Sequence, residues 1–217
     1  MQSWFKEVKK ETEPIIKAIK EHPFITELIN GSLPIDVFQF YINQDALYLS
    51  EYKKTLALIA TKCTNSNHTQ FFLDASTGII GVENALHHVF LKDDVFNNTV
   101  SPTCELYTSY LSRIVNQHSL PEGLAAILPC FTIYKEIGDY ILKHQTNKTD
   151  NPYQNWINTY GGEDFALSVK NAIKITDVHA QTASKQTLQN MGSIFKKASQ
   201  LEWMFWDSAY TKDLWKF

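Results

Sequence analysis

Apolar residues recur every three or four positions along most of the chain, and this helical period constrains the fold more than any other feature of the sequence. In the segment 3–21 the residues with this spacing are Trp4, Phe5, Val8, Ile15, Ile16 and Ile19. No Asn-Gly or Asp-Gly turn separates two strand-like runs, and no alternating stretch is bounded by turn residues. The sequence therefore predicts an all-α protein.

Proline, glycine and short polar stretches divide the chain into helical segments. These segments are expected at about 3–21, 33–63, 68–91, 102–117, 120–144, 153–160, 163–182 and 184–210. Ser32 is the expected N-cap of the second segment, and His22 is expected to cap or buttress its turn. No internal repeat and no Gly/Ser linker divides the chain, so residues 1–217 are predicted to form a single helical domain.

Composition and charge argue against several classes of protein. Lys and Arg number 20 against 23 Asp and Glu, and the formal net charge of −3 does not fit a general nucleic-acid binder. No run of about 18 apolar residues is present, so no membrane span is expected. The cysteines Cys63, Cys104 and Cys130 form no CxxC pair, and the amino terminus lacks the apolar core of a signal peptide. We therefore expect a soluble, cytoplasmic protein in a reducing compartment.

A thiol follows a proline in the stretch LPCFTIY, residues 128–134. Helices favour proline in their first turn, so Pro129 predicts that a helix begins here and that Cys130 lies among its free N–H groups. The positive end of the helix dipole would then favour a thiolate at Cys130. Tyr134 would project from the same face one turn later. The alternative is an ordinary buried cysteine, because free cysteine is among the most buried residue types.

Asp45 lies on a helix face that should be buried. It belongs to a stripe with offsets of four, three and four, formed by Tyr41, Asp45, Tyr48 and Tyr52. A carboxylate inside a stripe of tyrosines is either a core acid with phenol or amide partners, or a contact to a ligand.

Glu202 is a second acid in aromatic surroundings, close in sequence to Trp203, Phe205 and Trp206. If this face of the helix is buried, the pKa of Glu202 rises and the carboxyl can serve as a proton donor near pH 7. The alternative is an amphipathic helix that places Glu202 at its solvent edge.

Glu83 lies four residues before His87, so the two share one helix face. Di-iron helical bundles use Glu-x-x-His twice, and that spacing occurs nowhere in this chain. The spacing therefore favours a pair on the helix surface, or a pair that contacts residues of a site without touching its ligand, over a metal site. No metal is expected. His22 and His179 are weak candidates for haem ligation.

Seven motifs occur in order along nearly the whole chain. They are HPFI (22–25), LPIDVFQFYINQDALYL (33–49), ENALH (83–87), SPTCELYTSY (101–110), LPCFTIYKEIGDYI (128–141), YQNWINTYGGEDF (153–165) and LEWMFWDSAY (201–210). Together they resemble the TenA family, also called thiaminase II or aminopyrimidine aminohydrolase, in its cysteine-containing form. The resemblance implies a haem-oxygenase-like helical bundle, a homotetramer, one buried pocket per subunit, and no haem or other cofactor.

The resemblance also implies roles for individual residues. Cys130 matches the nucleophile, Glu202 matches the acid that acts on the ring nitrogen, and Asp45 matches the acid that holds the amino edge of an aminopyrimidine. The matching residues that line or orient the site are Tyr48, Tyr107, Tyr134 and Tyr160, with Phe24 and Phe205 as weaker candidates for packing on the ring. Ala46 and Leu47 depart from the family, which often places aromatic residues there. The sequence therefore does not determine the shape of the pocket near these two residues.

The sequence therefore predicts a hydrolase of thiamin salvage. Its substrate would be 4-amino-5-aminomethyl-2-methylpyrimidine and, more slowly, thiamin, with 4-amino-5-hydroxymethyl-2-methylpyrimidine as the product. A thiolate can add to the electron-poor ring if the ring nitrogen is protonated as charge builds. One alternative is a non-catalytic helical bundle that binds pyrimidine or acts as a regulator. Another is a haem or di-iron oxygenase of the same architecture, which would be coloured.

Overall fold

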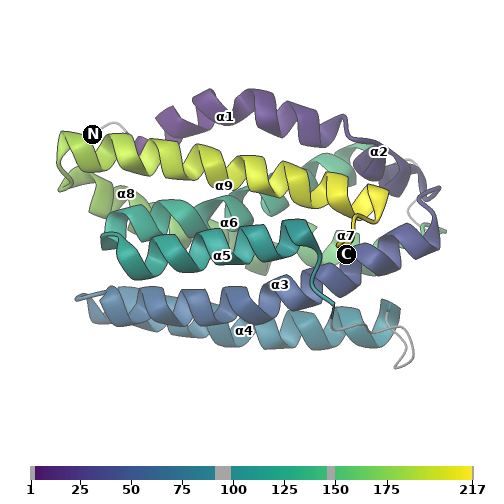
Figure 1. The fold of residues 1–217 in the computed structure, drawn as a ribbon, viewed down its shortest axis with the longest axis horizontal. Helices are drawn as coiled ribbons and strands as arrows, with labels where there is room; N and C mark the ends of the chain where they lie inside the picture. Colours follow the sequence, from purple (N-terminus) through teal and green to yellow (C-terminus); the bar gives the residue numbers. More distant parts are fainter. Residues whose placement is uncertain (1–2, 91–98, 146–149, 217) are drawn as a thin grey trace.

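The chain folds into a bundle of α-helices in a computed structural model, which describes residues 3–90, 99–145 and 150–216 without the side chains of 80–90. Across these ranges there are nine helices and no β-strand (Figure 1). The helices are α1 (Trp4–Lys20), α2 (Pro23–Asn30), α3 (Ile35–Lys62), α4 (Ser66–Phe90), α5 (Pro102–Gln117), α6 (Leu120–His144), α7 (Gln154–Gly161), α8 (Glu163–Gln181) and α9 (Lys185–Thr211). None of these described helices is long and apolar enough to span a membrane. The prediction of an all-α fold is confirmed.

Several helices begin where the sequence supplies a cap. The side chains of Ser3, Ser101 and Ser184 each accept a hydrogen bond from a backbone N–H three residues later, and a helix follows each of them. His22 caps α2, as expected, because its Nδ1 accepts a hydrogen bond from the Phe24 N–H at 3.1 Å. The predicted segments are confirmed, with ends that differ by a few residues.

A short helix that the sequence analysis did not predict, α2, lies between the first two predicted segments. Pro23 occupies its first turn, and Gly31 ends it in the left-handed conformation with φ of +71°. The expectation that Ser32 caps the next helix is wrong. Its backbone N–H donates to the Glu27 carbonyl at 2.9 Å to close the end of α2, and α3 begins only at Ile35.

Gly31→Ala is expected to lower the free energy of unfolding by about 1 kcal/mol, because a side chain is strained in the left-handed region. Its Cβ would also lie 3.3 Å from the Cδ of Pro152. The control is Gly192→Ala in α9, where a Cβ meets nothing within 4 Å. This second change should raise stability by about 0.5–1 kcal/mol. Urea unfolding measures both, and equal shifts in the same direction would contradict the role given to Gly31.

The helix α6 is the central element of the bundle. It packs against α5, α7, α8 and α9, whereas α3 and α4 lie side by side along one edge (Figure 1). An aromatic cluster joins three of the helices: Tyr41 of α3 stacks on Trp206 of α9 at 5.0 Å, and Trp156 of α7 packs edge-on against both rings. This cluster holds α3, α7 and α9 together on one side of α6.

The structure contradicts the expectation that a helix begins at Pro129. α6 is continuous from Leu120 to His144, and Cys130 lies roughly three turns after its start. The true start is set by Ser119 and Glu122, which form a capping box. Pro129 removes one hydrogen bond from the helix interior, a defect that burial of the helix on several sides offsets. Cys130 is therefore away from the helix dipole's positive end.

Candidate active site

A cavity of about 490 Å³ lies between α3, α4, α6, α7 and α8. Five of the residues expected at the site line it: Asp45, Tyr48, Cys130, Tyr134 and Tyr160. The first two come from α3, the next two from α6 and the last from α7. Residues three or four positions apart share one face of a helix, so each pair from α3 and α6 points to the same side. The structure thus brings together residues that are far apart in the sequence.

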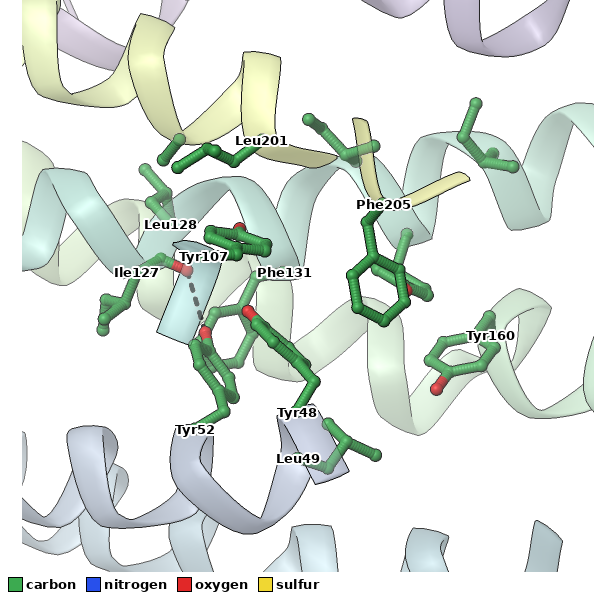
Figure 2. Packing of buried hydrophobic residues seen from close by; sticks show 14 of the residues in the cluster. Tyr48, Leu49, Tyr52, Tyr107, Ile127, Leu128, Phe131, Tyr160, Leu201 and Phe205 are labelled. Carbon is green, nitrogen blue, oxygen red and sulfur yellow. Dashed lines mark hydrogen bonds between the residues drawn. The ribbon is translucent and has the colours of Figure 1, made fainter. Parts of the chain in front are cut away.

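Tyrosine side chains form much of the inner wall. Tyr48 stacks on Tyr107 with 4.9 Å between ring centroids (Figure 2). The Tyr41 hydroxyl donates a hydrogen bond to the Tyr134 hydroxyl at 3.2 Å, and the Tyr134 and Tyr160 rings lie 4.9 Å apart. The Tyr48 hydroxyl is buried and has no hydrogen-bond partner among the described residues. Because buried polar groups are normally paired, this hydroxyl is available to a ligand or to a reacting group.

Glu202 lies inside the protein rather than at the solvent edge, so the edge alternative is wrong. Its side chain is 1% exposed, and the Tyr107 hydroxyl donates a hydrogen bond to its Oε1 at 2.7 Å. Burial raises the pKa of Glu202 to about 8; the Tyr107 hydrogen bond opposes this rise, and the charge of Asp45 adds to it. Glu202 is therefore largely protonated at pH 7, as the sequence analysis expected for a buried acid.

Cys130 is a neutral thiol in this environment. Burial is the main cause that raises its pKa well above the ordinary value, and the charge of Glu202 is the second. Contacts with the hydroxyls of Tyr48 and Tyr52 lower the pKa but do not outweigh the other two effects. These surroundings favour the neutral thiol over the expected thiolate, because the positive end of the helix dipole that was to stabilise the thiolate lies at Leu120 and not beside Cys130.

Glu202 and Cys130 lie near one another, close enough for the charge of the acid to act on the thiol and on Tyr48. Glu202 itself does not line the cavity, and neither do Tyr107 and Phe205. These two rings pack against Tyr48, with Phe205 at 5.6 Å between centroids, and so form a layer behind the wall (Figure 2). Glu202 is thus linked to the cavity through Tyr107, to which it is hydrogen-bonded and whose ring packs on the lining residue Tyr48.

Phe24, a weaker candidate for packing on the ring, does not line the cavity. Phe24 is fully buried and packs against Tyr41 at 5.1 Å and Trp206 at 5.2 Å, in the aromatic cluster. Glu83 and His87 lie in α4, but their side chains fall outside the described residues. Within the described part of the chain, no group of three or more His, Cys, Asp or Glu side chains is placed to hold a metal ion.

The structure adds residues that the sequence analysis did not assign to the site. Tyr52, one turn beyond Tyr48, lines the cavity, and its position in the tyrosine stripe was the signal for it. Asp74 from α4 and Asp164, Ser168 and Asn171 from α8 also line the cavity. These four are polar residues on helix faces near the surface, so nothing in the sequence separates them from ordinary solvent-exposed positions.

The Tyr52 hydroxyl donates a hydrogen bond to the Ile127 carbonyl at 2.8 Å (Figure 2). The same hydroxyl also lies close enough to Cys130 to lower the pKa of the thiol. When Cys130 ionises, the Tyr52 hydroxyl can turn its single proton from the Ile127 carbonyl to the sulfur, so Tyr52→Phe is expected to raise the pKa of the thiol and to slow its alkylation at a given pH by about threefold, because the carbonyl bond given up offsets part of the gain. Mass spectrometry of the modified protein measures the rate.

The matched control is Tyr153→Phe, because the Tyr153 hydroxyl also donates to a buried backbone carbonyl, that of Leu33, and does not line the cavity. Both changes should lower stability by about 1 kcal/mol, but only the change at Tyr52 should affect Cys130. Equal alkylation rates in wild type and Tyr52→Phe would contradict the contact.

The chain is similar in sequence to known proteins along most of its length. A sequence model of the TENA/THI-4/PQQC family matches residues 9–212. The aminopyrimidine aminohydrolase of Bacillus subtilis (strain 168) is 32% identical over 200 residues, which cover 89% of this chain and 84% of that protein. The aminopyrimidine aminohydrolase of Halalkalibacterium halodurans is 31% identical over 215 residues, with 96% of each chain covered.

Solved structures share the fold. A TenA homologue from P. horikoshii OT3 superposes with a TM-score of 0.86 at 25% identity and covers 97% of this chain and 99% of its own. A domain of unknown function from Shewanella denitrificans OS217, described as having a heme oxygenase-like fold, gives a TM-score of 0.77 at 15% identity, with 96% and 92% covered. The expected haem-oxygenase-like bundle is confirmed.

Proposed function

Since the chain belongs to the TENA/THI-4/PQQC family, we propose that it is an aminopyrimidine aminohydrolase of thiamin salvage. Its substrate would be 4-amino-5-aminomethyl-2-methylpyrimidine and, more slowly, thiamin, and its product 4-amino-5-hydroxymethyl-2-methylpyrimidine. The observation that supports the proposal is that Cys130 lines a tyrosine-walled cavity and feels the charge of Glu202, a buried acid whose pKa burial raises to about 8. Two relatives that carry the name of this activity support it.

Binding of the ring follows from the cavity wall. Asp45 is 3% exposed and can accept hydrogen bonds from the amino edge of the pyrimidine, a contact that is strong where water is excluded. Tyr134 and Tyr160 supply aromatic surface against which the ring can pack. A heterocycle without the amino group would leave Asp45 without this partner, so the acid selects aminopyrimidines.

The reaction begins with two neutral groups. The sulfur of Cys130 adds to a ring carbon while Glu202 gives its proton to the ring nitrogen, and the carboxylate so formed takes up the thiol proton. Glu202 then protonates the amine nitrogen on the exocyclic methylene, the C–N bond breaks as the amine leaves, and the carboxylate takes back the ring-nitrogen proton. Water adds its OH to the methylene carbon while its other proton goes to the ring nitrogen; the C–S bond then breaks and this proton passes to the thiolate, which restores the Cys130 thiol and protonated Glu202. One water is consumed and one amine is released.

Two tyrosines support these groups. The unpaired hydroxyl of Tyr48 contacts Cys130 and can donate to the sulfur as it gains negative charge. Tyr107 donates to Glu202 and so holds the carboxyl in place. Because these hydroxyls are already positioned before the substrate binds, they stabilise charge without reorganisation during the reaction.

The proposal is tested by incubating the protein with the aminomethylpyrimidine in ¹⁸O-labelled water and identifying the product by mass spectrometry. The expected result is hydroxymethylpyrimidine that carries one labelled oxygen, with one ammonia released for each molecule formed. Pyrimidine binding without any turnover would overturn the proposal and favour the non-catalytic alternative.

A homotetramer in the cytoplasm, implied by the family resemblance, completes the proposal. An apolar groove of about 710 Å³ between α1, α5 and α9 supports assembly, because it includes the exposed side chains Leu106 and Met204. Light scattering measures the mass in solution, and a monomer at micromolar concentration would contradict the assembly.

A further inference from the structure

The cavity extends beyond the part that a single ring would fill. Its inner part is formed by buried residues such as Tyr48, Tyr52 and Phe131 (Figure 2), whereas α4 and α8 contribute exposed residues to its outer part. The volume of about 490 Å³ lies within the roughly 300–1,000 Å³ of sites that hold drug-sized ligands. The outer part therefore has room for a second chemical group attached to the ring.

The wall of the cavity is acidic. Among the residues described there, three are aspartates and none is Lys, Arg or His. Asp45 lies in the inner part, and the exposed Asp74 of α4 and Asp164 of α8 lie in the outer part. Both outer acids also have local roles, because Asp74 accepts a hydrogen bond from the Gln70 side chain at 2.7 Å and Asp164 lies in the first turn of α8. Neither of these local contacts places a positively charged side chain beside Asp74 or Asp164, so the negative charge of the two acids is not neutralised by them.

Two further features indicate that a ligand occupies this space. The buried Tyr48 hydroxyl lines the same cavity beside the Cys130 thiol without a hydrogen bond of normal geometry, so it can still bond a ligand. Gly78 also lines the cavity, and a Cβ placed there would meet nothing within 4 Å. Glycine inside a helix costs about 1 kcal/mol relative to alanine, and no close neighbour of Gly78 requires it. The absence of a side chain at Gly78 leaves the outer part of the cavity wider than an alanine would.

We propose that the outer part of the cavity is a subsite for the leaving group, and that it favours positively charged leaving groups over neutral ones and disfavours phosphorylated ones. The inference rests on the proposed hydrolase function. If the amino edge of the ring lies at Asp45 and the thiol beside the ring, the group on the exocyclic methylene has room to extend toward the outer part, which Asp74 and Asp164 line. A thiazolium or an ammonium group gains favourable interactions there, and a phosphate meets like charge without a cationic partner.

The preference of the subsite for positive charge is tested with four substrates that contain the same pyrimidine ring. They are the aminomethyl compound, its neutral N-formyl derivative, thiamin and thiamin monophosphate. The double variant Asp74→Asn, Asp164→Asn is expected to lose about three- to tenfold in kcat/KM for the aminomethyl compound and thiamin at low salt. The formyl compound should change less than about twofold, and the loss should shrink as salt screens the acids. For thiamin monophosphate, kcat/KM should rise relative to thiamin.

The matched control is Glu163→Gln, which removes an exposed acid from the same end of α8 but not from the cavity wall. It should leave the ratio of cationic to neutral substrates unchanged. If Asp164 mattered only through the helix dipole, Glu163→Gln and Asp164→Asn would shift all substrates alike, and the proposed subsite would be rejected.

The available space is tested at Gly78. Gly78→Leu should lower kcat/KM for the two-ring substrate thiamin by about tenfold, because overpacking costs about 1–3 kcal/mol, and should change the aminomethyl compound less than about twofold. Gly192→Leu, at an equally open glycine in α9 away from the cavity, should change neither. Equal losses for both substrates would overturn the assignment.

The two levels of the proposal fail in different ways. If wild type converts none of the four substrates, the hydrolase function fails and the leaving-group subsite fails with it. If wild type converts them but the substrate ratios do not respond to the changes at Asp74, Asp164 and Gly78, only the subsite fails. Thiamin binding to Cys130→Ala, measured by calorimetry in the presence and absence of the two Asp→Asn changes, gives a second readout that needs no turnover.

Discussion

Cys130→Ala is expected to reduce the formation of hydroxymethylpyrimidine by at least about a thousandfold, because the sulfur forms the covalent bond on which every later step depends. Cys130→Ser should be almost as inactive, since a buried hydroxyl is harder to deprotonate than a thiol. Steady-state turnover of the aminomethylpyrimidine measures both changes. The pyrimidine product should still bind to Cys130→Ala, because Asp45 and the tyrosines of the wall remain.

The control for this prediction is Cys63→Ala. Cys63 is half-buried at the end of α3 and does not line the cavity. Cys104 is a poorer control, because it is fully buried and its thiol donates to the Gln44 carbonyl at 3.6 Å, beside Asp45. Turnover by Cys130→Ala at more than a few per cent of the wild-type rate, with the helical circular-dichroism spectrum retained, would rule out the nucleophile.

Glu202→Gln is expected to lower turnover by about 100- to 1,000-fold, because an amide cannot deliver a proton to the ring nitrogen. The fold should survive, since glutamine resembles the protonated carboxyl in shape and its carbonyl can still accept the Tyr107 hydrogen bond. Glu202→Asp tests position in addition to chemistry, because the shortened side chain keeps the acid but loses contact with Tyr107. Turnover close to wild type in Glu202→Gln would remove the proton-donor role.

The pH dependence gives this prediction a second readout. The pKa of Glu202 is raised to about 8, so the acid is protonated below that pH and wild-type turnover should fall as the pH rises through about 8. Folded Glu202 keeps its proton between its ordinary pKa and the raised value, so wild-type stability should fall over the same window. Glu202→Gln cannot ionise, and its stability relative to wild type should therefore rise between about pH 4.5 and pH 8. A constant stability difference would show that the pKa is not raised.

Local sequence rules predicted most of the helices. Ser3, Ser101 and Ser184 cap helices as such residues usually do, and the period of the apolar positions located the buried faces. The stripe that includes Asp45 and Tyr48 was placed at the interior for the same reason. These features depend on neighbours within a few positions, which a single sequence contains.

Features that depend on packing between helices were harder to predict from the sequence. The rule that proline marks a helix start failed at Pro129, because contacts with the surrounding helices hold α6 continuous past it. That failure changed the chemistry assigned to Cys130 from a thiolate to a thiol. The outer cavity was also missed, since Asp74 and Asp164 differ from other surface acids only in which helices face them.

The raised pKa of Cys130 has a consequence for survival of the protein under oxidative stress. Thiolates attack hydrogen peroxide and glutathione disulfide far faster than thiols do, because the thiolate is the nucleophile. Because burial and the nearby acid keep Cys130 protonated when the cavity is empty, its sulfur should resist oxidation while the protein waits for substrate. Peroxide should therefore modify Cys130 more slowly than an exposed cysteine with an ordinary pKa, even over long exposure.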